Sequence, residues 1–205
     1  MKQDYCHICV VLDASGSMNC IKKDTQGSFN SFIDSQKKEE GKTVFDLFQF
    51  NTEVTRPVKS ADLSKIDHSL MKNYHCEGCT ALHDAVCIAI DTLGQEFAAM
   101  PEEERPESVI VAILTDGEEN SSRRFSAEDV KKHIEHQRDV YSWEFVFLAA
   151  NQDACTVGGS LGMRADDCVG WVQSAAGMGK ACACMADRVF FTREKRRQQR
   201  QKDSN

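Results

Sequence analysis

The 205-residue sequence predicts a doubly wound α/β domain, with a mostly parallel central sheet of about six strands and helices on both faces. Two observations point to this fold. Continuous apolar runs such as 7–12 and 109–114 are typical of parallel strands that are covered on both faces. Amphipathic helical stretches alternate with these runs along the chain, as in βαβ units. A chain of this length can bury a single large core without disulfides.

In the first half of the chain, the pattern predicts three strands and one long helix. The strands are expected at about 5–12, 44–50 and 54–58, and the helix at about 20–38. The apolar stripe of this helix consists of Ile21, Phe29, Phe32 and Ile33. The turn at 51–53 predicts an antiparallel hairpin for the third strand. Pro57 restricts that strand to an edge of the sheet or to its own end.

The second half alternates more regularly after a stretch without a clear pattern at 60–77. Strands are expected at about 108–115, 143–150 and 167–172, and helices at about 81–100, 126–140, 153–157 and 174–199. Ser126 is a typical N-cap for the helix that follows it. Gly158 and Gly159 are expected to close the short helix before them. Phe191 is expected on the inner face of the last helix.

The charge distribution predicts one domain at 1–192, followed by a basic polar tail at 193–205. The net charge of −7 argues against a nucleic-acid partner. Residues 188–205 carry seven Lys or Arg and two Asp or Glu, a net charge of +5, and we expect the tail to be frayed. No run approaches the ~20 apolar residues of a membrane span, and no secretory signal precedes the first strand. We therefore expect a cytoplasmic protein with no membrane partner.

The first expected strand ends in a stretch of short, oxygen-bearing side chains. Asp13, Ser15 and Ser17 stand at positions i, i+2 and i+4, directly after the apolar run. Gly16 allows the backbone to turn tightly between the two Ser residues. Carboxylate and hydroxyl oxygens suit a hard cation such as Mg²⁺. On its own, the stretch also fits a capped turn from a strand into a helix, without any ligand.

Two later stretches carry oxygen donors that could join the first. Thr80 stands at the start of the helix expected at 81–100, and Asp116 follows the strand expected at 108–115. In doubly wound sheets, the loops at the carboxyl ends of the strands converge at one edge, where ligands bind. Because Asp13 and Asp116 each end a strand, we expect both of them at this edge.

The set Asp13, Ser15, Ser17, Thr80 and Asp116, in that order, resembles the metal-ion-dependent adhesion site (MIDAS) of von Willebrand factor A (vWA) domains. The resemblance covers about residues 5–190 and is to the intracellular type found in bacteria and phages. It implies a vWA or Rossmann-like fold, direct metal contacts from the three hydroxyls, and contacts from the two Asp directly or through water. Mg²⁺ is the expected metal, with Ca²⁺ or Mn²⁺ as alternatives.

Such a site predicts a metal-dependent protein-binding module and not an enzyme. Two carboxylates neutralise one divalent cation, and no protein group is left for the sixth octahedral position. An Asp or Glu of a partner protein would fill that position. Some vWA domains work with AAA+ ATPases, so such an ATPase is one candidate partner. Two alternatives stay open: a Mg²⁺-dependent hydrolase that uses His83 as its base, and a metal that only stabilises the structure.

Two further motifs resemble known sites, a hydrolase nucleophile and a zinc site, but the expected fold argues against both. Gly158–Gly162 matches the Gly-x-Ser-x-Gly turn of hydrolases, but the preceding strand is expected to end near 150 and no His follows Ser160. The pairs Cys6-x-x-Cys9 and Cys76-x-x-Cys79 have zinc-site spacing. Cys6 should nevertheless lie about 23 Å from the edge that holds Thr80, because it begins the first strand. We expect these Cys to be unliganded thiols.

Glu118 and Glu119 add two carboxylates next to Asp116. The simpler interpretation is that they are solvated loop charges that cap a turn. Alternatively, they could attract a cationic surface or shift the metal preference toward Ca²⁺.

Overall fold

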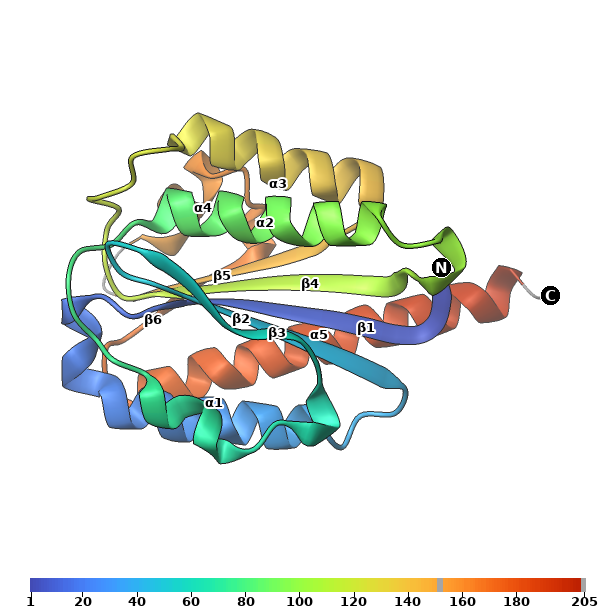
Figure 1. Cartoon of the computed structure of the whole chain (residues 1–205), viewed down its shortest axis with the longest axis horizontal. Helices are drawn as coiled ribbons and strands as arrows, with labels where there is room; N and C mark the ends of the chain where they lie inside the picture. Colours follow the sequence, from blue (N-terminus) through green and yellow to red (C-terminus); the bar gives the residue numbers. More distant parts are fainter. Residues whose placement is uncertain (151–152, 204–205) are drawn as a thin grey trace.

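The computed structural model describes residues 1–150 and 153–203, and it contains the expected six-stranded sheet (Figure 1). The strands are β1 (Lys2–Asp13), β2 (Lys42–Phe50), β3 (Val54–Asp62), β4 (Pro106–Thr115), β5 (Glu144–Ala150) and β6 (Cys168–Trp171). Their order across the sheet is β3-β2-β1-β4-β5-β6, and every neighbouring pair is parallel except β2 and β3. The predicted doubly wound, mostly parallel sheet is therefore confirmed.

Helices cover both faces of this sheet. The α-helices are α1 (Lys22–Gln36), α2 (Leu82–Ala98), α3 (Ala127–Tyr141), α4 (Ala154–Ser160) and α5 (Ala175–Asp203). Short 3₁₀ helices occur at Gly16–Ile21, Leu63–Lys65, His68–Asn73, Glu102–Glu104 and Ala165–Asp167. Figure 1 shows α1 and α5 on one face, and α2, α3 and α4 on the other. None of the helices that the structure describes is long and apolar enough to cross a membrane.

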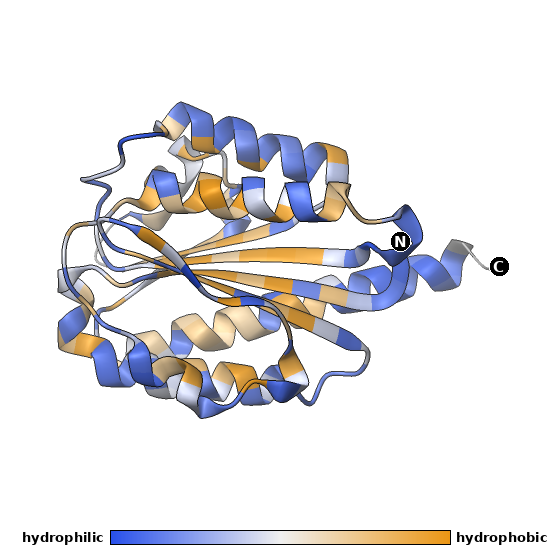
Figure 2. Cartoon of the chain, in the orientation of Figure 1, coloured by the Kyte–Doolittle hydropathy of each residue, from blue (hydrophilic) through white to orange (hydrophobic). Residues whose placement is uncertain are grey.

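The core forms two layers because side chains alternate along the central strands. In β1, Ile8, Val10 and Leu12 pack into the layer beneath α1 and α5. Cys9 and Val11 point the other way, into the layer beneath α2 and α3. Figure 2 shows apolar strands in the middle of the molecule and polar residues on the outer faces of the helices. The continuous apolar run in the sequence thus reflects burial on both faces.

Three local features follow the sequence closely. The hairpin β2–β3 is antiparallel, and β3, which contains Pro57, lies at the edge of the sheet. Ser126 caps α3 in a reciprocal arrangement with Asp129, in which each side chain accepts a backbone N–H of the other. Ser142 follows α3 in the left-handed conformation and ends it.

Two expectations about the later helices are wrong. Gly158 and Gly159 lie inside α4 and do not close it. A Cβ on Gly158 would come within 2.3 Å of Cys168 Sγ, so this Gly allows α4 to pack closely on β6. Phe191 is 65% exposed. It follows the buried Val189 by two residues, which is about 200° around the helix, so it points away from the core.

The C-terminal segment expected as a frayed tail is helical up to residue 203. Helix α5 runs without a break across the expected boundary at 192 and extends past the start of β1 (Figure 1). Arg193 is buried and donates hydrogen bonds to Glu40 O at 3.1 Å and Thr43 Oγ1 at 2.6 Å. Arg200 pairs with Asp4 at 2.7 Å. Through these contacts, basic residues of α5 hold the helix against the sheet.

A buried polar network joins β1, β2, β3 and α2. His7 Nε2 lies 2.7 Å from Asp46 Oδ2, and Arg56 Nε donates to Asp46 Oδ1 at 2.6 Å. Arg56 also makes two hydrogen bonds to Glu96. Burial alone would raise the pKa of Asp46, but the hydrogen bonds with His7 and Arg56 outweigh it and lower the pKa.

Asp46→Ala is expected to lower the free energy of unfolding by ~2–3 kcal/mol, because the buried His7 loses its partner and Arg56 keeps only its other bonds, including those to Glu96. Urea unfolding measures this loss. Asp34→Ala removes the exposed pair with His68 and serves as the control, with an expected change within ~1 kcal/mol. Equal losses for the two variants would contradict the structural role assigned to Asp46.

Candidate metal-ion site

The predicted site residues lie around the carboxyl ends of β1 and β4, which are neighbours in the sheet. Asp13 is the last residue of β1, and Asp116 directly follows β4. Thr80 comes from the loop before α2, and Gly16 N donates to Gly78 O in that loop at 3.1 Å. Three loops that are distant in the sequence therefore meet at one edge of the sheet.

Asp13 is fully buried, and both of its carboxylate oxygens accept hydrogen bonds. Ser15 N donates to Oδ1 at 2.7 Å, and the hydroxyl of Thr115 donates to Oδ2 at 2.6 Å. These two bonds fix the carboxylate in orientation, with further lone pairs available for a ligand. The sequence analysis missed Thr115, although it stands between the apolar part of β4 and Asp116.

Ser15 and Ser17 link Asp13 to Asp116. Ser15 Oγ lies 3.0 Å from Ser17 Oγ, and Ser17 Oγ donates to Asp116 Oδ1 at 2.6 Å. Ser15, Ser17 and Asp116 therefore form a chain of oxygen contacts, and the backbone N–H of Ser15 joins Asp13 to it. Between the two Ser residues, Gly16 N donates to Gly78 O, which holds this loop against the loop that carries Thr80.

Thr80 completes the group from the opposite loop. A Cβ placed on Gly117 would lie 3.5 Å from Thr80 Oγ1 and 3.7 Å from Ser17 Oγ, so both hydroxyls lie within 4 Å of one point. Gly117 leaves that space free of a side chain of its own. Two hydrogen bonds with Asn120 hold Thr80 in place. Thr80 N donates to Asn120 Oδ1 at 2.9 Å, and Asn120 N donates to Thr80 O at 3.0 Å.

The two carboxylates are poorly compensated. Burial raises the pKa of Asp13, against hydrogen bonds from Thr115 and Ser15 that lower it. Burial also raises the pKa of Asp116, and the hydrogen bonds from Ser17 and Gln173 only partly offset it. Within 1–150 and 153–203, neither Asp has an ion pair with Lys, Arg or His. Two buried negative charges beside three hydroxyls fit a divalent cation with oxygen ligands.

The donor set also differs from that of a structural zinc centre built from Cys and His. Among the described residues, no group of three or more His, Cys, Asp and Glu is arranged to hold a metal. The candidate site has only two such residues and takes its other oxygens from hydroxyls. Hydroxyl and carboxylate oxygens match the preferences of Mg²⁺, Ca²⁺ and Mn²⁺ better than those of a soft metal.

The structure adds Gln173, which the sequence analysis also missed. Its side-chain nitrogen donates to Asp116 Oδ2 and to Ser17 O, the latter at 3.3 Å. Gln173 lies between β6 and α5, far from the other site residues in the sequence, and no motif marks it. Only the folded arrangement brings it to the site.

The acidic pair after Asp116 divides into two roles. Glu119 accepts hydrogen bonds from Ser121 N, from Ser122 N and Oγ, and from His83 N, so it braces the loop onto the start of α2. Glu118 is exposed. The simpler interpretation, loop charges that organise a turn, holds for Glu119. His83 Nδ1 lies 3.8 Å from Glu119 Oε2.

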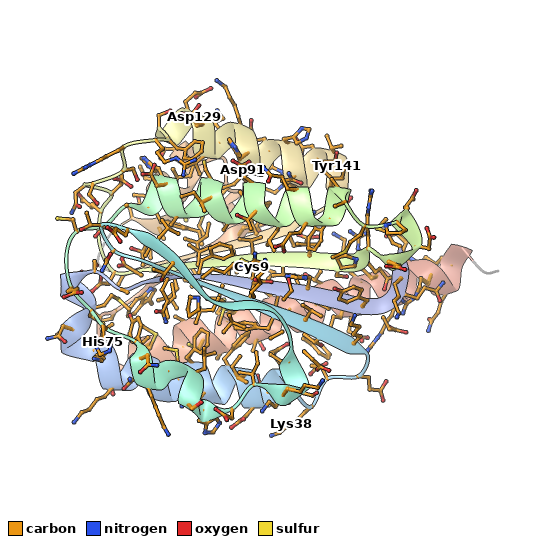
Figure 3. All side chains as sticks on the ribbon, in the orientation of Figure 1. Cys9, Lys38, His75, Asp91, Asp129 and Tyr141 are labelled. Atoms are coloured by element: carbon orange, nitrogen blue, oxygen red, sulfur yellow. The ribbon has the colours of Figure 1, made fainter. Side chains whose placement is uncertain are left out.

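The two competing motifs have structural explanations. Ser160 is the last residue of α4 and donates its hydroxyl to Val157 O, so it does not lie on a strand-to-helix turn. Cys9 lies in the middle of the sheet, whereas His75, next to Cys76, lies toward the end where β1 finishes (Figure 3). The two Cys pairs are therefore separate, and all ten Cys are free.

Solved structures share this fold, although a scan against protein-family models and a search of curated proteins both find no match. Proximal thread matrix protein 1 from the mussel byssus, in a structure with a zinc-occupied MIDAS motif, gives a TM-score of 0.67 and 17% identity over 92% of this chain and 47% of that chain. A von Willebrand factor type A protein from Catenulispora acidiphila gives a TM-score of 0.59 and 14% identity over 90% of this chain and 42% of that chain. The vWF domain of the pili tip protein Mfa5 from Porphyromonas gingivalis gives a TM-score of 0.65 and 8% identity over 91% of this chain and 95% of that chain.

The chain therefore has the fold of von Willebrand factor A domains. It spans about half the length of the mussel and Catenulispora chains and nearly all of the Mfa5 domain. At these low identities the similarity establishes the fold, while the site rests on the residues of this chain.

Asp13→Asn is expected to leave the free energy of unfolding at pH 7 unchanged or higher when EDTA is present. The amide can accept from Ser15 N and donate to Thr115 Oγ1, and the substitution removes a poorly compensated charge. Asp84→Asn is the matched control. Its carboxylate accepts three backbone N–H groups, from Arg123, Arg124 and Phe125, so we expect a loss of ~2 kcal/mol in urea unfolding.

The pH dependence of stability in the wild type and in Asp13→Asn provides a second measurement. The folded protein binds a proton at Asp13 more tightly than the unfolded chain does, so the charge of Asp13 lowers stability above its raised pKa. The advantage of Asp13→Asn over the wild type should therefore shrink as the pH falls toward 4. A large loss of stability in Asp13→Asn at pH 7 would contradict this account.

Proposed function

We propose that the chain is a divalent-metal-dependent protein-binding module. Ser15, Ser17 and Thr80 would hold the cation through their hydroxyls, and Asp13 and Asp116 would hold it directly or through water. Mg²⁺ is the proposed metal, with Ca²⁺ or Mn²⁺ as alternatives. The observation that carries the proposal is the meeting of two buried, poorly compensated carboxylates with three hydroxyls at one edge of the sheet.

The charge of this donor set favours an acidic partner. The five donors leave the sixth octahedral position of the cation to another ligand, and the three hydroxyls add no charge. Where Asp13 or Asp116 binds through water, the ion keeps positive charge that attracts an anionic ligand. A partner's Asp or Glu would supply that ligand, and the cation would then bridge the two proteins. An AAA+ ATPase is one candidate partner, by analogy with some vWA domains of the intracellular bacterial and phage type.

Two further lines of support are indirect. The mussel protein with the same fold carries zinc at its MIDAS motif, which agrees with a cation at this position in the fold. The ten free Cys suit a reducing compartment, and we propose a cytoplasmic location on that basis.

We also propose that the module is not an enzyme. A hydrolase would need a base close to the cation, and His83 is the nearest candidate in the sequence. The backbone N–H of His83 is bonded to Glu119, and its ring faces the same carboxylate, so it has a structural role in the loop.

Mg²⁺ is expected to raise the melting temperature by roughly 5–10 °C at about 100 times its Kd, because a ligand at this excess stabilises the fold by ~2.7 kcal/mol. Thr80→Val keeps the shape of the side chain and removes the hydroxyl, so most of this rise should disappear. Thr92→Val removes a hydroxyl that bonds only within α2 and should keep the full rise. Thermal unfolding with Mg²⁺ and with EDTA compares the three proteins.

Partner binding should depend on the same residues. In a pull-down from native lysate, proteins retained with Mg²⁺ should be released by EDTA and should bind Asp13→Ala at least ~10-fold less, which corresponds to ~1.4 kcal/mol. Asp34→Ala removes an exposed carboxylate away from the site and should bind like the wild type. Retention that is equal with EDTA and in Asp13→Ala would reject the proposed function.

A further inference from the structure

Gln173 contacts the candidate metal site from a fourth segment of the chain. It lies between β6 and α5, and its side-chain nitrogen donates to Asp116 Oδ2 and, at 3.3 Å, to Ser17 O. The other oxygen of Asp116 accepts the hydroxyl of Ser17. Ser17 thus bonds Oδ1 of Asp116, and Gln173 bonds the other carboxylate oxygen, Oδ2.

The chemistry of an amide suits this position. The N–H of Gln173 and a cation would compete for lone pairs on the same oxygen of Asp116. The amide also carries a carbonyl oxygen on the same carbon, and a half-turn about its last side-chain bond exchanges the nitrogen for that oxygen. Gln173 can thus either bond Asp116 as a donor or offer an uncharged oxygen to a neighbouring cation. Because it is uncharged, it is a weaker cation ligand than a carboxylate.

We propose that Gln173 is an internal, displaceable occupant of the position that a partner's carboxylate takes. This inference rests on the proposed function. While no partner is present, the amide holds Asp116 and covers the open side of the cation site. A partner's carboxylate binds the cation more strongly than the amide does, and it displaces the Gln173 side chain.

The backbone around Gln173 limits the movement to the side chain. Ser174 Oγ accepts the backbone N–H of Gly177 at 3.1 Å, and a Cβ on Gly177 would come within 1.8 Å of Val172 O. The turn from β6 into α5 is therefore too tight to be displaced easily. Exchange between Gln173 and a partner then requires side-chain rotation alone, which is fast in comparison with movements of helices.

The test uses Mn²⁺ as the probe ion and acetate as the probe carboxylate. Water-proton relaxation reports how many exchangeable waters the bound Mn²⁺ holds, and acetate lowers that number when it binds the ion. Gln173→Ala should hold more exchangeable water than the wild type, and acetate should act at a concentration at least ~3-fold lower, because no internal occupant competes. Gln198→Ala changes an exposed Gln on α5 and should match the wild type.

Gln173→Glu tests the same idea in the opposite direction. A carboxylate of the same shape should bind the ion permanently, so Mn²⁺ should bind ~10-fold more tightly and acetate should no longer change the relaxation. A merely structural role for Gln173 would not produce opposite effects in the two variants. If the wild type binds Mn²⁺ but the acetate response is the same in all variants, this inference is wrong and the metal site stands. If no variant binds Mn²⁺, the proposed function itself fails.

Discussion

Two reciprocal hydrogen bonds between the ends of β1 and β4 organise this edge of the molecule. Thr115 of β4 donates its hydroxyl to Asp13 of β1, and Ser17, after β1, donates its hydroxyl to Asp116, after β4. Each strand end thereby binds the acid of the other, which keeps two like charges close together in a buried place. Hydroxyl donors weaken the repulsion only in part, since they supply partial charges and no cation.

The topology explains why the site forms between these two strands. From β1 the chain adds β2 and β3 on one side, and from β4 it adds β5 and β6 on the other. The gap between β1 and β4 is the point at which the strand order reverses, and the loops leaving the two strands turn to opposite faces there. Short loops with Gly16 and Gly117 can then carry oxygen donors close to one point.

Much of this could be predicted from sequence because the signals are local. The apolar runs fix the central strands, and the spacing of Asp13, Ser15 and Ser17 marks the first donor loop. Thr115 and Gln173 could not be identified, because a hydroxyl within a strand and an amide after one have no pattern of their own. The contacts of the C-terminal segment could not be predicted either, since charge alone suggested a frayed tail. There Arg193 bonds to the carbonyl of Glu40, just before β2, and to the hydroxyl of Thr43 in β2, and Arg200 pairs with Asp4 in β1. Only the folded structure brings these partners within reach.

Two other buried acids, Asp46 and Asp84, differ from Asp13 and Asp116 in the partners that they have. Asp46 is bonded to Arg56 and His7, and Asp84 accepts three backbone N–H groups, so in both cases the pKa is lowered in spite of burial. At the ends of β1 and β4 the partners are hydroxyls, the backbone N–H of Ser15 and the side-chain amide of Gln173, and the pKa of both acids is raised. Burial also raises the pKa of Asp167, but that carboxylate pairs with Arg188 at 2.9 Å. Asp13 and Asp116 have no such cation among the described residues and lie beside three hydroxyls, which gives this edge the electrostatic character of a cation-binding site.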